Sequence, residues 1–150
     1  MTTRSTNPND PQTSIELRVR TMRTLWIGGV LSLGAFYVFT IMSGRSDTVN
    51  PNQTVSLATL IGAMVAALVS FPIKSKLLSS AIEQQQPGMV QQAYVVAWTV
   101  NEVGALLSLL DFFLTGNRYY FVGLIIAGCV QLLHFPRREH VINAAFKNTL

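Results

Sequence analysis

The chain has 150 residues, of which 49% are hydrophobic and only 12% are charged. Soluble domains carry about 25% charged residues, so this composition is typical of a protein that lies in a membrane. The apolar content excludes a disordered chain, and a single cysteine, Cys129, excludes a disulfide-stapled scaffold. The 11 Lys and Arg residues are few and scattered, so we predict no nucleic-acid partner.

Four stretches of the chain are long and apolar enough to cross about 30 Å of hydrocarbon as helices. They are residues 23–43, 55–73, 93–114 and 119–136. Helices are expected because an open sheet would leave backbone groups unpaired in lipid. Residues 1–13 are polar and predict a disordered tail, which ends at Ser14, a helix cap. The predicted fold class is therefore all-α, with one integral membrane bundle of four transmembrane helices over residues 14–150.

The positive charges are concentrated in the segments that would lie on one side of the membrane. Nine of the eleven lie in the two terminal segments and the middle loop: Arg4, Arg18, Arg20, Arg23, Lys74, Lys76, Arg137, Arg138 and Lys147. The cytoplasmic segments of multi-pass membrane proteins carry the excess of cations, which is the positive-inside rule. We therefore predict a multi-pass protein of a bacterial inner membrane, with both termini in the cytoplasm.

The ends of the second and fourth segments resemble each other, since Phe71-Pro72-Ile73-Lys74 matches Phe135-Pro136-Arg137-Arg138. The apolar positions that follow each proline also match and would share one side of a helix. One interpretation is a duplicated helical hairpin, in which each unit ends in a short amphipathic cytoplasmic helix that begins at the proline. The other is convergence, because membrane segments share a similar composition.

Small residues mark the expected contacts between helices, because lipid supplies no hydrophobic drive for helix association. We predict that seven of them pack at helix interfaces: Gly34, Ala58, Gly62, Ala66, Gly104, Gly123 and Ala127. Each segment has such a face, which predicts a compact bundle. The pattern leaves open whether these faces meet within one chain or between copies in a homo-oligomer.

Glu102 is the sharpest functional candidate, because ionisable residues are costly inside a membrane. It lies near the middle of the third segment, next to Asn101. One interpretation is a binding site for a proton or cation at these two residues. The alternative is a protonated Glu102 that joins two helices by a hydrogen bond. Secondary polar candidates are Asp111, Gln131 and His134, with Asp111 expected near the outer interface, within reach of water or Arg118, and His134 at the cytoplasmic end.

No catalytic arrangement is recognisable in the sequence. Ser108 and Asp111 are expected near the outer surface and His134 near the inner one, so they cannot form a hydrolytic triad. No His or Cys spacing is typical of a metal site, and no histidine pair suits a haem. We therefore predict a protein that is not an enzyme and that has no cofactor or metal.

The central hairpin resembles the proteolipid, or subunit c, of rotary ATP synthases. It pairs a small-residue helix, GAMVAALVS, with a polar loop, AIEQQQPG, and then a helix with a mid-membrane carboxylate, VVAWTVNEVGALLSLL. This resemblance implies that Glu102 is the ion-binding carboxylate. It also implies that Gln86 and Pro87 belong to the loop that contacts the rotor.

Two functions are compatible with these features. The first is a non-enzymatic structural or accessory subunit of a membrane assembly, which requires a protein partner or a second copy. The alternative is a proton- or cation-coupled membrane element centred on Glu102.

Overall fold

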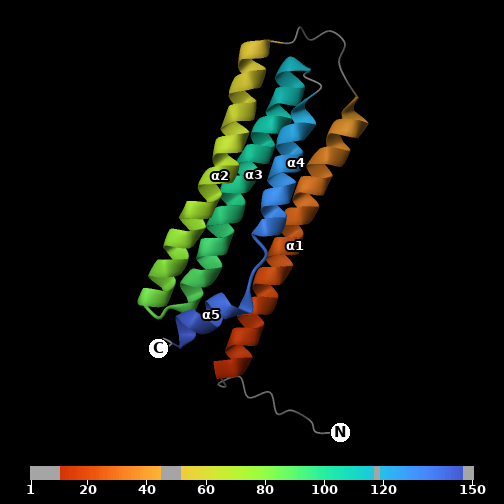
Figure 1. Ribbon diagram of the computed structural model, residues 1–150. Coiled ribbons are helices and arrows are strands. Elements are labelled where there is room, and N and C mark those ends of the chain that lie inside the picture. Colours follow the sequence, from red (N-terminus) through yellow and green to blue (C-terminus); the bar gives the residue numbers. More distant parts are fainter. Residues whose placement is uncertain (1–10, 45–51, 117–118, 147–150) are drawn as a thin grey trace, which may run out of the picture.

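The computed structural model describes residues 11–44, 52–116 and 119–146, and these are almost entirely helical. The helices are α1 (Pro11–Ser43), α2 (Gln53–Glu83), α3 (Pro87–Thr115), α4 (Tyr120–Leu133) and α5 (Arg138–Ala145). The predicted all-α class is confirmed, and the described ranges contain no strand. Figure 1 shows α1 to α4 running side by side, with α5 turned across the end of the bundle at which α1 begins.

Three helices, α1, α2 and α3, are long and apolar enough to cross a membrane. A fourth span is counted only if α4 and α5 are taken together, because they meet at a bend of 49°. Several helices are thus long and apolar enough to span a membrane, which is consistent with a multi-pass membrane protein.

The first helix begins earlier than the sequence predicts. The expected disorder of residues 11–13 is wrong, since α1 begins at Pro11, before the predicted cap at Ser14. The rest of the predicted tail, residues 1–10, lies outside the described residues. The early turns are held by packing, because Ile15, Val19 and Met22 belong to a buried cluster that also includes residues of α2, α3 and α5. The sequence does not reveal this contact, because its partners are distant along the chain.

Helices α2 and α3 form a tightly packed hairpin. Their connection is short, and Gln85 adopts a left-handed conformation with φ of 51° before α3 begins at Pro87. The two backbones approach closely at Gly104, where an added Cβ would lie 2.9 Å from the carbonyl oxygen of Ala63. Close approach at a glycine is typical of helix pairs in membranes. A second tight contact joins α3 to α4, where a Cβ at Gly123 would overlap the hydroxyl of Ser108.

The buried face of α2 is shifted by one position along the chain from the predicted packing residues Ala58, Gly62 and Ala66. The residues buried in the apolar part of α2 are Thr59, Ala63, Ala67 and Ser70. Ala58 is exposed, whereas Gly62 and Ala66 are half-buried at the edge of the contact with α3. Two adjacent rows of small residues run along this helix, and the sequence pattern suits either row. Only the position of α3 selects between them.

Gly34, which was predicted to pack at a helix interface, makes no such contact within the described part of the chain. A Cβ added at this position would meet no atom within 4 Å. Ala127, in contrast, is buried in an apolar cluster with Leu33, Ala105 and Leu124. This cluster joins α1, α3 and α4 at the end of the bundle away from α5.

The two matching proline segments adopt different structures. The short helix expected to begin at Pro72 is wrong, because α2 continues through this proline to Glu83. At the second proline segment, α4 ends at Leu133, and α5 begins only at Arg138.

The break between α4 and α5 is stabilised by side chains of α3. Trp98 Nε1 donates to the carbonyl oxygen of His134 at 3.2 Å, and the Tyr94 hydroxyl accepts from the Arg137 amide at 3.2 Å. A break in a helix leaves backbone groups that need such partners when buried. The turn at the second proline therefore depends on two aromatic residues that lie about 40 positions earlier in the chain.

Candidate functional site

The predicted Asn101 and Gln131 meet in the interior, where both side chains are fully buried. Asn101 Nδ2 donates to the carbonyl oxygen of Ala127 at 2.8 Å and to Gln131 Oε1 at 3.1 Å. Because a backbone carbonyl can only accept, the nitrogen of Asn101 must face Ala127. The oxygen of Gln131 must then face that nitrogen, so the orientations of both amides are determined.

This pairing leaves one polar atom of each amide without a hydrogen bond. In the described part of the chain, neither Asn101 Oδ1 nor Gln131 Nε2 has a partner. Buried polar atoms are nearly always satisfied, and an exception calls for a physical reason. An unpaired acceptor and an unpaired donor thus lie within one small region between α3 and α4.

Glu102 faces the same region from α3. A Cβ added at Gly29 of α1 would lie 2.6 Å from Gln131 Nε2 and 3.6 Å from Glu102 Oε1. The amide donor and the carboxylate therefore both point toward the bare backbone of Gly29. Glu102 is half-buried, and no side chain among the described residues donates a hydrogen bond to it.

Helix α1 is joined to this region by a hydrogen bond from its side chain Trp26 to the backbone of α4. Trp26 Nε1 donates to the carbonyl oxygen of Gln131 at 2.7 Å. Three helices, α1, α3 and α4, therefore meet at the level of Glu102. Sequence reasoning missed the roles of Trp26 and Gly29, although the pair Gly28-Gly29 in an apolar segment was a visible sign of close contact.

His134 lies in a separate cluster near α5 and is fully buried, not exposed among lipid headgroups. Its Nε2 lies 2.8 Å from Ser70 Oγ, and its Nδ1 lies 2.8 Å from Lys74 Nζ. The Ser70 hydroxyl also donates to the carbonyl oxygen of Ala67 at 2.6 Å. Sequence reasoning did not bring Ser70 or Lys74 to His134, because they are about 60 residues away.

The hydrogen bonds of this cluster determine the direction of each donor. An ammonium group can only donate, so His134 Nδ1 accepts from Lys74 and His134 Nε2–H donates to Ser70. The imidazole thus cannot take a proton from the serine, as a general base in a hydrolytic pair must. The cluster is an internal tie between α2 and the end of α4.

Asp111 is likewise buried, with 3% of its surface exposed, and does not lie at the water-accessible surface. Its Oδ2 accepts from Ser56 of α2 at 3.0 Å, and its Oδ1 accepts from Thr115 at 2.7 Å. The expected neighbour Arg118 lies outside the described residues. Asp111 is nine residues from Glu102 on α3 and belongs to a different contact, one between α2 and α3.

The predicted polar candidates therefore divide into three places. Asn101, Glu102 and Gln131 come together at the meeting point of α1, α3 and α4, whereas His134 and Asp111 each join α2 to another helix. Within the described ranges, no group of three or more His, Cys, Asp or Glu side chains could hold a metal ion.

An apolar groove of about 400 Å³ runs between α1 and α4 on the outer face of the bundle. Its lining includes Leu33, Gly34, Tyr37, Leu124, Gly128 and Gln131. A Cβ added at Gly34 or at Gly128 would meet no atom within 4 Å, so neither glycine is required by a contact within the chain. The groove ends at Gln131, close to the polar region described above.

Comparison with known proteins gives no relative from which a function can be transferred. No protein-family model matches the chain, and neither the curated proteins nor the solved structures contain a match to it.

Proposed function

We propose that this chain is a non-enzymatic accessory subunit that binds one transmembrane helix of a different membrane protein in the groove between α1 and α4. In this proposal the bent pair of α4 and α5 supplies a fourth span, so that four transmembrane segments form the bundle. The membrane is a bacterial inner membrane, and both termini are cytoplasmic. All seven cations in the described ranges lie toward the end with α5 and the α2–α3 turn, which supports this orientation.

The observation that carries the proposal is the pair of glycines in the groove. Glycine disfavours a helix by about 1 kcal/mol relative to alanine, but in membranes it allows the close approach of another backbone. Gly34 and Gly128 line the same groove from two helices, whereas Gly28 lies outside it. Gly34 and Gly128 receive no such contact within the described chain, whereas flexible lipid tails need no glycine beside them.

The shape of the groove favours a helix from another protein over a second copy of this chain. A two-fold dimer pairs the same surface on both subunits. Two concave grooves facing each other would leave their space unfilled. A single apolar helix fills it, and its backbone can approach both glycines.

Filling the groove is expected to abolish partner binding without loss of folding. In the variant Gly34→Leu with Gly128→Leu, co-purification of the partner from native membranes in mild detergent should fall at least ten-fold. Expression and the thermal unfolding midpoint should stay near wild type, because both glycines face open space. The matched control is Gly28→Leu, which also meets no atom within 4 Å on α1 but lies outside the groove.

Photocrosslinking identifies the occupant. A photoreactive residue at Leu132, in the groove, should crosslink to one distinct membrane protein, whereas one at Leu68, on the exposed face of α2, should not. Crosslinks between two copies of this chain would show that the groove is occupied in a homo-oligomer and not by a different protein. Equal capture from both positions, or equal loss in the Gly28→Leu control, would contradict the proposal.

A second candidate function is proton binding at Glu102, in line with the resemblance of the central hairpin to rotary ATP synthase proteolipids. The supporting observation is that this carboxylate and the unpaired Gln131 amide point at the same glycine. In such an arrangement the Glu102 carboxylate can gain or lose a proton while the packing of the helices around it stays the same.

Glu102→Gln is expected to retain expression and thermal stability and to remove a protonated carboxyl band from the pH-difference infrared spectrum. Glutamine keeps the shape of the side chain but cannot ionise. Glu83→Gln, at the exposed end of α2, is the control and should leave the band in place. If Glu102→Gln instead lowers expression and stability, or if the band persists, Glu102 is only a structural hydrogen-bonding residue.

A further inference from the structure

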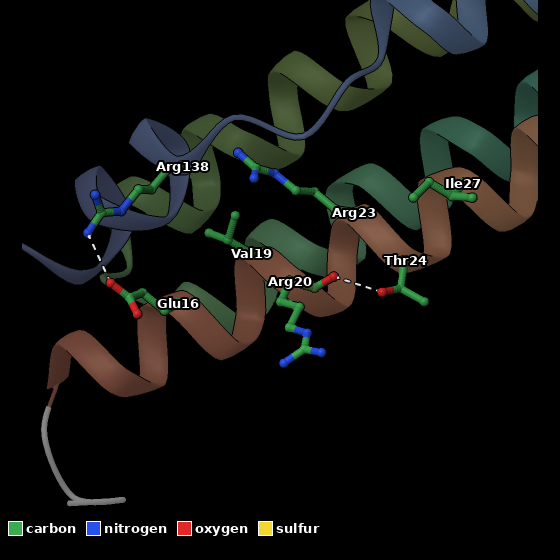
Figure 2. A pocket seen from close by; sticks show the side chains of 7 residues that line it. All are labelled: Glu16, Val19, Arg20, Arg23, Thr24, Ile27 and Arg138. Atoms are coloured by element: carbon green, nitrogen blue, oxygen red, sulfur yellow. Dashed lines mark hydrogen bonds and ion pairs between the residues drawn. The ribbon is translucent and has the colours of Figure 1, made fainter. Parts of the chain in front are cut away.

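A second cavity, of about 430 Å³, lies between the N-terminal part of α1 and α5. Its lining includes Glu16, Val19, Arg20, Arg23, Ile27 and Arg138. Figure 2 shows Arg23 reaching from α1 toward the segment between α4 and α5, and Arg138 reaching from α5 toward Glu16. Val19 lies between these two arginines, and Arg20 extends from α1 away from α5.

The cavity carries an excess of positive charge. Its three arginines and one glutamate give a net charge of +2 (three minus one). The ion pair between Arg138 and Glu16 is long, at 3.9 Å, and both side chains are more than half exposed, so it holds Arg138 only weakly. Arg23 lies 5.5 Å from the centre of the Phe135 ring, which orients its guanidinium near the α4–α5 segment.

The position of the cavity along α1 corresponds to the edge of the apolar span. Arg23 is the last charged residue of α1, and residues 24–43 contain none. Ile27 follows one turn later in the cavity wall and is half exposed. The guanidinium groups therefore lie where headgroups are expected, and the apolar wall continues toward the hydrocarbon.

We infer that this cavity binds the phosphate headgroup of an anionic phospholipid, with Arg23 and Arg138 as its direct ligands. Guanidinium groups bind phosphate oxygens through paired, charge-assisted hydrogen bonds. Basic pockets between helices at the cytoplasmic side of a membrane are typical sites for anionic headgroups. A soluble phosphate has the same charge chemistry, but it makes no use of Val19 and Ile27. The lipid accounts for both the charged and the apolar part of the lining.

Binding can be measured on the purified full-length chain after delipidation. We propose titrations, followed by native mass spectrometry and thermal unfolding, with dioleoyl-phosphatidylglycerol, dioleoyl-phosphatidylcholine and inorganic phosphate. The two lipids share their acyl chains, so their difference reports the headgroup charge. Phosphatidylglycerol should bind and stabilise the chain, and the other two compounds should do so several-fold more weakly.

Variants of the cavity test the assignment of ligands. Arg23→Gln and Arg138→Gln should each weaken phosphatidylglycerol binding about five-fold, because each loses one favourable charge near the headgroup. Glu16→Gln should strengthen binding, because it removes the glutamate of the lining, whose negative charge repels an anionic headgroup. Arg18→Gln is the matched control: Arg18 is on the same helix but lies against the start of α3, outside the cavity.

Each outcome bears on the inference. Equal binding of the two lipids overturns it. Phosphate binding as strong as that of phosphatidylglycerol would show that the ligand is a soluble anion and not a lipid. A loss in Arg18→Gln as large as in Arg23→Gln shows attraction to overall charge and not a site. If an arginine variant does not fold, Glu16→Gln still decides, because unchanged or weaker binding contradicts the cavity.

Discussion

Replacing Gly104 with leucine is expected to separate α2 from α3 and to lower the free energy of unfolding by about 3 kcal/mol. Even a single added Cβ would lie 2.9 Å from the carbonyl oxygen of Ala63 and 3.4 Å from its Cα. These are backbone atoms of a helix, so they cannot move aside as a flexible side chain would. The helices must shift apart, and the contacts along the hairpin weaken together.

The measurement is reversible unfolding of the purified chain in mixed detergent micelles, followed by circular dichroism. Gly28→Leu serves as the control, because it adds the same side chain on an exposed face of α1 where no atom lies within 4 Å. The control should change the free energy of unfolding by less than 1 kcal/mol. If the two variants were equally stable, the close backbone contact at Gly104 would not be present in the membrane.

Replacing His134 with leucine is expected to have a comparable cost, also about 3 kcal/mol. The imidazole accepts from Lys74 Nζ and donates to Ser70 Oγ, each at 2.8 Å. Its removal leaves a half-buried ammonium group without this acceptor. An unpaired buried charge costs more than the hydrogen bond itself contributes.

The double variant His134→Leu with Lys74→Met separates this cause from simple loss of packing. It removes the charge together with its acceptor, so it should be more stable than His134→Leu alone by at least 1 kcal/mol. Lys76→Met, an exposed lysine on the same helix, is the control and should not rescue His134→Leu. A double variant no more stable than His134→Leu would show that Lys74 does not depend on the imidazole.

The position of the helices could be predicted from the sequence because it depends on local properties. A membrane helix is a run of about 20 apolar residues, and its hydrogen bonds close within the segment. The first three apolar stretches therefore correspond to α1, α2 and α3, whereas the fourth, residues 119–136, extends past the end of α4, which has only 14 residues. The prediction was less accurate where packing extends a helix beyond its apolar run, as at Ile15 and Val19 of α1.

Part of the polar region was also visible in advance. Glu102, Asn101 and Gln131 were singled out because polar groups are rare and costly within apolar segments. The spacing along one helix could not show that the Asn101 amide would meet Gln131 on another. Nor could it show that Gln131 Nε2 and Glu102 Oε1 would both point toward Gly29 of α1, which has no side chain to fill that space.

By itself, the sequence determined that this chain is all-helical, that several of its helices are long and apolar enough to span a membrane, and which polar residues lie within its apolar segments, since these follow from the free energy of placing each residue in lipid. Only the tertiary structure decided which row of small residues on α2 is buried and why the helix breaks at one proline segment but continues through the other. It also decided that His134 lies against Lys74 and that two arginines face one cavity. These features depend on contacts between residues far apart in the chain, and the local pattern is compatible with several such contacts.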